Sequence, residues 1–251
     1  MDRVVAALED QQVELSDLVA GLDDVGWQAP SRCEGWTVAD VVLHLAQTNE
    51  MALASLEGRL PAFLDDFYAG LPAATDVDEG ADLAVRRERG AAPAELLDRW
   101  RTGAAFLLAA FEAADLQTRV TWVAGDLTAR TLATTRLAET WIHTGDVAAG
   151  LGVELEPTER LWHIARLAWR TLPYAFARAG RSLAGPVAFD LRAPGGDGWH
   201  FSSEEAPLTT VSGDALELCL VAGRRLPGAE SDLRADGPDA DAVLELVRTF
   251  A

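Results

Sequence analysis

Lysine is missing from this sequence of 251 residues, in which arginine supplies all 21 basic side chains. No lysine is therefore available as a general base or to form a Schiff base with a carbonyl substrate. Cysteine is scarce as well: only Cys33 and Cys219 occur, and they form neither a C-x-x-C pair nor a zinc-ribbon spacing. So few cysteines, placed so far apart, are typical of a reducing compartment, and we expect a cytoplasmic protein.

Long apolar runs are also missing. No segment approaches the roughly 18 uninterrupted apolar residues that a membrane-spanning helix needs, and the first residues open an amphipathic pattern instead of an apolar signal core. The 21 basic residues face 40 acidic ones, which gives a formal net charge of −19. Because such a charge repels nucleic-acid phosphates and anionic lipids, we expect neither a nucleic acid nor a membrane as a partner.

Amphipathic helices dominate the first 150 residues. Apolar residues recur at steps of three and four in the segments 2–22, 36–58, 94–114 and 128–149. Thr37 and Asp40 resemble a capping box, so we expect the second helix to start there. Prolines and glycines interrupt residues 60–90, for which the pattern predicts no definite element. Four long helices favour a four-helix bundle.

The pattern changes after residue 152. A helix is expected over 158–179, with Pro173 as a candidate bend. Short alternating segments then predict strands at 187–191, 198–201, 208–211 and near 231–234, with helices at 213–222 and 238–250. The sequence therefore predicts an α+β protein, with a helical bundle in residues 1–152 and a small C-terminal α+β domain in residues 153–251.

Three residues on two predicted helices suggest a metal site. Glu139 and His143 are four residues apart, which places both side chains on one helix face. His44 lies on the inward stripe of the second helix and could supply a third ligand. Two histidines and a glutamate leave an open coordination position, as catalytic metal sites do. Asp146, one turn beyond His143, could orient that ring. Spacing alone leaves a second interpretation open, in which Glu139 and His143 are a solvated surface pair.

Two segments resemble the mycothiol-dependent maleylpyruvate isomerase family. Residues 27–45 (WQAPSRCEGWTVADVVLHL) resemble the opening motif of that family, and residues 135–147 (TRLAETWIHTGDV) resemble its second motif. The family has a DinB-like four-helix bundle that binds zinc through two histidines and a glutamate. The resemblance thus implies His44, Glu139 and His143 as ligands of one divalent metal, with Zn²⁺ as the expected ion.

The C-terminal half carries two further resemblances. Residues 211–225 (VSGDALELCLVAGRR) resemble the C-terminal α+β domain of the family, which contains an arginine implicated in activity. The resemblance implies a catalytic role for Arg224 or Arg225, although arginines at a helix end are also favoured by the helix dipole. Residues 166–176 (RLAWRTLPYAF) resemble an actinobacterial metal-binding subgroup with unassigned activities. The fold and the metal should therefore transfer better than the maleylpyruvate substrate.

The remaining cysteines and histidines carry weaker signals. Cys33 lacks an evident basic partner in the sequence and is expected to be a loop cysteine. Cys219 lies on an apolar helix face, which predicts a core position. His163 and His200 lack the spacing of metal ligands. The tryptophans Trp36, Trp122 and Trp141 are expected to serve packing first, and any of them could line a pocket beside the metal.

The resulting expectation is a metal-dependent enzyme that acts on a small molecule, as a monomer or a homodimer. Mycothiol, a low-molecular-weight thiol, would be the co-substrate for isomerisation or S-transfer on a small electrophile that bears a carboxylate. One alternative is a thiol-independent, metal-assisted lyase, cyclase or hydrolase. A second alternative is a metal-binding module without catalytic activity.

Overall fold

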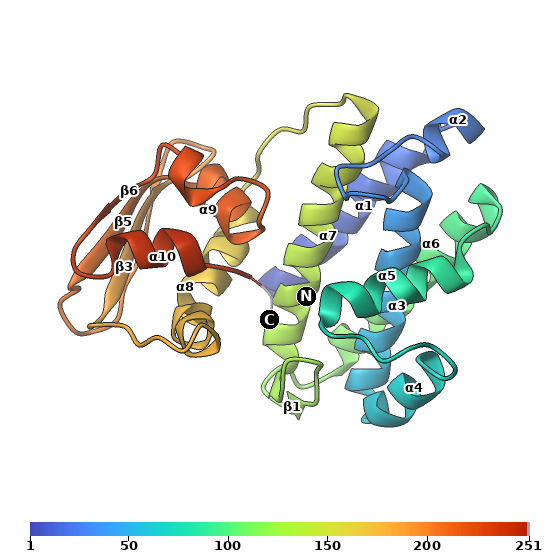
Figure 1. The fold of residues 1–251 in the computed structure, drawn as a ribbon, viewed down its shortest axis with the longest axis horizontal. Coiled ribbons are helices and arrows are strands. Elements are labelled where there is room, and N and C mark those ends of the chain that lie inside the picture. Colours follow the sequence, from blue (N-terminus) through green and yellow to red (C-terminus); the bar gives the residue numbers. More distant parts are fainter. Residues whose placement is uncertain (250–251) are drawn as a thin grey trace. The chain divides into compact units, whose positions relative to one another are not determined.

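The chain folds into two compact units, Met1–Leu155 and Glu156–Ala251. A computed structural model describes residues 1–249. The first unit is helical, and the second combines helices with a four-stranded sheet (Figure 1). This arrangement confirms the predicted α+β class.

Four long helices form the body of the first unit. They are α1 (Arg3–Ala20), α3 (Val38–Leu56), α6 (Pro93–Ala113) and α7 (Ala129–Leu151). Helices α3 and α1 each pack against both α6 and α7. The apolar stripes meet in a core that includes Leu8, Leu15, Val41, Leu45, Trp100, Leu107 and Leu137. The apolar period of the sequence thus predicted all four helices.

Capping residues define the ends of helices α3 and α7. Thr37 and Asp40 form the expected capping box at the start of α3, with each side chain bound to the backbone of the other. Helix α7 begins after Thr128, whose hydroxyl accepts from the backbone N–H of Thr131. It ends at Gly152, a left-handed residue that suits glycine.

Residues 60–90, for which no element was predicted, contain two short helices. They are α4 (Leu60–Phe67) and α5 (Val77–Glu88), which pack against α3. Pro61 lies in the first turn of α4, where its missing N–H leaves no hydrogen bond unmade. The proline therefore marks the start of a helix and does not interrupt one. The short helix α2 (Asp24–Trp27) and the β1–β2 hairpin (Arg119–Val120, Leu127–Thr128) complete this unit.

Arg99 ties three helices of the first unit together. It donates two hydrogen bonds to Glu50 on α3, at 2.7 and 2.9 Å, and one to Glu88 on α5, at 2.6 Å. Burial raises the pKa of Glu88, but the hydrogen bond and the charge of Arg99 outweigh burial, so the net shift is downward. A lowered carboxyl pKa stabilises the fold above the unfolded value and loses this effect as the pH falls.

We expect Arg99→Met to lower the free energy of unfolding by about 1 kcal/mol at pH 7, since all three side chains are partly exposed. The loss should shrink below about pH 4, where glutamates become protonated. Denaturant melts at both pH values measure it. Arg101→Met is the matched control, because Arg101 on the same helix donates to the Ser16 hydroxyl. An equal loss at both pH values, or in both variants, would contradict the ion-pair explanation.

The second unit covers one sheet with three helices. Its elements are α8 (Leu161–Arg178), β3 (Val187–Arg192), β4 (Gly198–Phe201), β5 (Thr209–Asp214), α9 (Ala215–Ala222), the 3₁₀ turn η1 (Gly228–Glu230), β6 (Arg234–Asp236) and α10 (Ala240–Leu246). The strand order is β4-β3-β5-β6, in which β3 and β5 are parallel and the other pairs antiparallel.

Two predicted boundaries in this unit were wrong. The strand expected near 231–234 lies at Arg234–Asp236, and the helix expected over 238–250 ends at Leu246. Residue 250 of that predicted helix lies outside the described residues. Pro173 lies inside α8, as expected for that segment, and Cys219 is fully buried in α9. Element types were thus predicted better than their ends, where helices fray and short strands lack a clear period.

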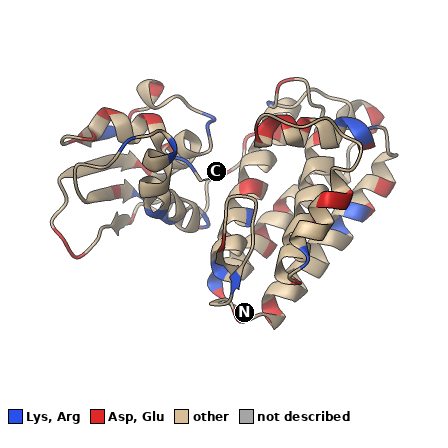
Figure 2. Ribbon diagram, turned by 60° about the horizontal axis from the view of Figure 1, so that its bottom comes forward, with Lys and Arg blue, Asp and Glu red and all other residues tan. Residues whose placement is uncertain are grey.

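The excess of acidic residues in the sequence is spread over both units. Acidic residues occur in helices and loops of both units, among a smaller number of arginines (Figure 2). Within residues 1–249, every helix is too short or too polar to cross a membrane.

Candidate metal centre

Helices α3 and α7 bring the three predicted ligands together. His44 comes from α3, and Glu139 and His143 come from successive turns of α7. One donor atom from each residue lies within 4.8 Å of the other two. The i, i+4 spacing on α7 and the packing of α3 against α7 therefore place three potential ligands around one point.

Both imidazole rings turn Nε2 toward the same carboxylate oxygen. Oε1 of Glu139 lies 3.2 Å from Nε2 of His44 and 3.3 Å from Nε2 of His143. Each imidazole side chain is 10% exposed, and the Glu139 side chain is 26% exposed. The cluster is therefore largely buried, and solvent reaches it beside Glu139.

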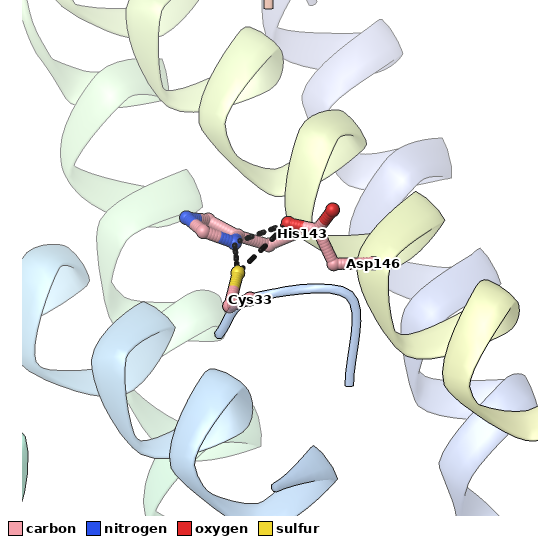
Figure 3. A group of neighbouring side chains, drawn as sticks. All are labelled: Cys33, His143 and Asp146. Carbon is pink, nitrogen blue, oxygen red and sulfur yellow. Dashed lines mark hydrogen bonds and ion pairs between the residues drawn. The ribbon is translucent and has the colours of Figure 1, made fainter. Parts of the chain in front are cut away.

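Asp146 contacts the second ring nitrogen of His143, Nδ1. Its Oδ2 lies 3.0 Å from Nδ1 of His143 and accepts a hydrogen bond from the Cys33 thiol at 3.1 Å (Figure 3). The Sγ atom of Cys33 lies 3.7 Å from the same Nδ1. A carboxylate at Nδ1 favours the tautomer that presents Nε2 as a ligand.

The contacts of His143 also suit a cation between the ring and Glu139. A neutral imidazole carries one N–H and cannot donate to two carboxylates at once. The contact between Nε2 and Glu139 therefore needs either a second proton or a positive ion. The donor set, with two imidazole nitrogens and one carboxylate oxygen, fits a divalent metal such as zinc.

The pKa shifts follow from the same contacts. Burial lowers the pKa of His143, but contacts with Asp146, Cys33 and Glu139 outweigh it and hold the pKa well above its usual range. Burial raises the pKa of Glu139, but hydrogen bonds from both histidines bring it well below the usual range. Burial lowers the pKa of His44. Without a metal, the two carboxylates beside His143 thus favour its protonated form.

The loop of residues 30–36 lies directly on α7, which the sequence did not predict. The backbone N–H of Arg32 donates to the carbonyl of Asp146 at 3.1 Å. A Cβ atom at Gly150 would lie 2.3 Å from the Pro30 carbonyl oxygen, so only glycine permits this approach. Cys33 is a loop cysteine, as expected, but the expectation that it lacks a basic partner was wrong. The loop brings its thiol to His143 and Asp146, which are 110 and 113 positions away in the sequence.

Trp36 lines the centre on the side of α3. Its ring lies 5.2 Å from the His44 ring and stacks at 6.5 Å on the His143 ring. Its Nε1 donates to Asp82 on α5 at 3.1 Å, which fixes the orientation of the indole. Trp36 therefore covers part of the cluster, as the sequence suggested for one of the tryptophans.

Arg136 is a charged neighbour of the centre that the sequence analysis missed. It lies on α7 one turn before Glu139 and is 2% exposed. Its Nη2 donates to the hydroxyl of Thr48 and to Oδ1 of Asn49, at 2.9 and 3.2 Å. The spacing of three residues to Glu139 was the available signal, because it places both side chains on one helix face.

Arg224 and Arg225 follow α9 in the second unit. The backbone N–H of Arg225 donates to Leu220 at 2.8 Å, and that of Arg224 donates to Val221 at 3.0 Å, as in a Schellman motif. Arg224 has φ of 61°, the left-handed position where glycine is usual. Its side chain is exposed, whereas Arg225 is half-buried and Nη1 donates to the Gly223 carbonyl.

The other histidines lie elsewhere. His200 on β4 contacts Asp190 on β3 and Ser202. Within residues 1–249, the clusters of potential metal ligands contain neither His163 nor His200. Those clusters are His44, Glu139 and His143, and the overlapping group Cys33, His143 and Asp146.

The fold and the cluster define a two-unit α+β protein with a buried His-Glu-His group inside a helical bundle. Residues 8–148 match the family described as mycothiol maleylpyruvate isomerase N-terminal domain. The chain belongs to this family.

Relatives extend the similarity over the whole chain. Two uncharacterized proteins of Mycobacterium tuberculosis, Rv0036c and MT0041, are each 34% identical over 249 residues, which cover 98% of this chain and 95% of theirs. The crystal structure of the mycothiol-dependent maleylpyruvate isomerase matches with a TM-score of 0.60 at 17% identity and covers 94% of both chains. A mutant of that enzyme matches with a TM-score of 0.59 at 18% identity. At such identities the solved structures establish a shared fold.

Proposed function

We propose that His44, Glu139 and His143 hold one divalent metal ion, and that the protein is a metal-dependent enzyme using a low-molecular-weight thiol. The reaction would be isomerisation or S-transfer on a small electrophile that carries a carboxylate. The observation that carries the proposal is the convergence of three donor atoms within 4.8 Å, with one carboxylate oxygen shared by two imidazoles. The family to which the chain belongs supports mycothiol as the thiol.

The residues around the centre have separable roles in this proposal. When bound, a divalent ion lowers the pKa of a coordinated thiol and so supplies a thiolate near neutral pH. Asp146 keeps the proton of His143 on Nδ1 and thereby orients Nε2. Trp36 shields one side of the two rings from water. The exposed part of Glu139 marks the side from which a small molecule can approach.

Arg224 is the better candidate of the two arginines for binding a substrate carboxylate. A non-glycine residue with φ of 61° is strained, and such strain often marks functional positions. The exposed guanidinium is available for a bidentate contact with a carboxylate. Arg225, in contrast, already donates to the backbone of Gly223.

Replacing Arg224 should change stability and turnover in opposite directions. Arg224→Gly removes the strain, so we expect the second unit to become more stable by up to about 1 kcal/mol. Turnover of a carboxylate-bearing electrophile should fall. Arg224→Ala is the matched variant, because it removes the charge but keeps the left-handed strain. It should lose the same turnover without the gain in melting temperature. Full turnover in both variants would contradict a role for Arg224.

A spectroscopic titration tests the thiol-dependent chemistry and separates it from the alternatives. The cobalt-substituted protein is titrated with mycothiol, and the absorption of cobalt–thiolate bonds is followed. We expect a sulfur-to-cobalt charge-transfer band that saturates with thiol. A pH-titratable cobalt spectrum without any thiol response would instead favour a thiol-independent enzyme. A spectrum of a closed four-ligand site would favour a module without catalytic activity.

A further inference from the structure

Arg136 shares a helix face with two of the three proposed ligands. It precedes Glu139 by three residues and His143 by seven, or one and two turns of α7. Burial lowers the pKa of His44, and the charge of Arg136 adds to this shift. Burial also lowers the pKa of Arg136 to about 10, against the opposing effect of Glu139, so the guanidinium stays charged at neutral pH.

This buried cation makes its hydrogen bonds to neutral groups. Thr48 and Asn49, both on α3, accept from its Nη2. Within the described part of the chain, Nε of Arg136 and Nδ2 of the adjacent Asn49 are buried donors without an acceptor. A buried guanidinium without a hydrogen-bonded carboxylate is costly for the fold. The cost suggests that the charge itself has a use.

The charge balance of the centre depends on Arg136. Two carboxylates contact the proposed ligands: Glu139, which is itself a ligand and interacts with Arg136, and Asp146, which lies at Nδ1 of His143. With a divalent ion in place, the ion and Arg136 would bring three positive charges against these two carboxylates. Without Arg136 the charges would balance, so this residue decides whether the loaded centre is positive or neutral.

We propose that Arg136 is a specificity-determining residue, whose buried charge makes the metal centre prefer an anionic ligand, a thiolate or a carboxylate, over a neutral one. The inference rests on the metal centre proposed above and adds the class of ligand that it selects. Arg136 acts through the electrostatic potential at the centre, which falls slowly with distance in a partly buried environment.

The variant Arg136→Gln tests this inference with two readouts of opposite sign. Removing a cation from beside the centre should make Co²⁺ bind about tenfold more tightly, since the repulsion disappears. The same change should make azide bind the cobalt-loaded protein about tenfold more weakly. Imidazole, a neutral ligand, should bind as before. Arg130→Gln is the matched control. Arg130 lies in the first turn of α7, away from the proposed ligands, where it is exposed and pairs with Asp2.

A second variant retains Arg136 and compensates its positive charge with a new carboxylate. Asn49→Asp is nearly isosteric and places a carboxylate beside Nη2 of Arg136, where the amide oxygen lies at 3.2 Å. The new ion pair should preserve the fold and shift both affinities in the same directions as Arg136→Gln. This variant therefore tests the inference even if Arg136→Gln does not fold.

The outcomes separate this inference from the proposed function. Cobalt affinity that falls together with azide affinity, or an azide-to-imidazole preference that stays unchanged in the folded variants, would reduce Arg136 to a packing role. A wild-type protein that binds no cobalt would overturn the metal centre and this inference together. Tighter cobalt and weaker azide in both variants, with Arg130→Gln unchanged, is the expected result.

Discussion

Replacing His143 with alanine is expected to reduce bound metal from about one ion per chain to nearly none, because two remaining protein ligands are too few to fix the ion. His143 has a carboxylate at each ring nitrogen, with Glu139 at Nε2 and Asp146 at Nδ1. Elemental analysis of protein purified without a metal-affinity tag measures the effect. Thiol-dependent absorption of the cobalt-substituted protein should disappear with the metal.

His200→Ala is the matched control for this variant. His200 also pairs with an aspartate, Asp190, but both of these side chains are exposed to solvent, on strands of the second unit. The His200→Ala substitution should leave the metal content unchanged. A His143→Ala protein that folds, as judged by its melting curve, and still retains a full equivalent of zinc would contradict the proposed ligand set.

The second large effect should follow from Asp146→Ala. Asp146 is fully buried and holds Nδ1 of His143, so its loss frees the ring to change tautomer and orientation. Loss of such an orienting partner typically weakens metal binding by about 10- to 100-fold. Competition with a chelator of known affinity gives the dissociation constants. Asp190→Ala removes the equivalent carboxylate from the His200 pair and should have no effect.

Asp146→Asn divides the role of Asp146 into geometry and charge. An asparagine oxygen can still accept from Nδ1, so the orientation of His143 should survive while the negative charge is lost. We expect a smaller loss of metal affinity than in Asp146→Ala. Equal affinities in the wild type and both variants would mean that His143 needs no partner at Nδ1.

The local parts of the centre could be predicted from the sequence. Glu139 and His143 lie one turn apart because of helix geometry, and Thr37 with Asp40 defines where α3 begins. The inward position of His44 follows from the apolar stripe of the same helix. Which helices pack together was implied by the resemblance to a family, since spacing alone left a solvated pair possible.

The features of the centre that could not be predicted depend on contacts between segments that are distant in the sequence. Cys33 reaches Asp146 only because a loop with no apolar period folds onto α7 at Gly150, and nothing local encodes that approach. Arg136 was overlooked for a different reason. Arginine is usually exposed, so its burial at 2% against Thr48 and Asn49 becomes visible only in the folded bundle.

The first coordination shell of the bound ion tests the central claim most directly. The neighbouring group Cys33, His143 and Asp146 also offers three donor atoms. It shares only His143 with the proposed centre, and it has a sulfur donor where the proposed centre has a second nitrogen. X-ray absorption at the zinc edge, recorded on protein without added thiol, distinguishes the two groups of ligands. We predict only nitrogen and oxygen neighbours at about 2.0–2.1 Å, from His44, Glu139 and His143. A sulfur neighbour at about 2.3 Å that disappears in Cys33→Ser would place the ion on the other side of His143 and contradict this account.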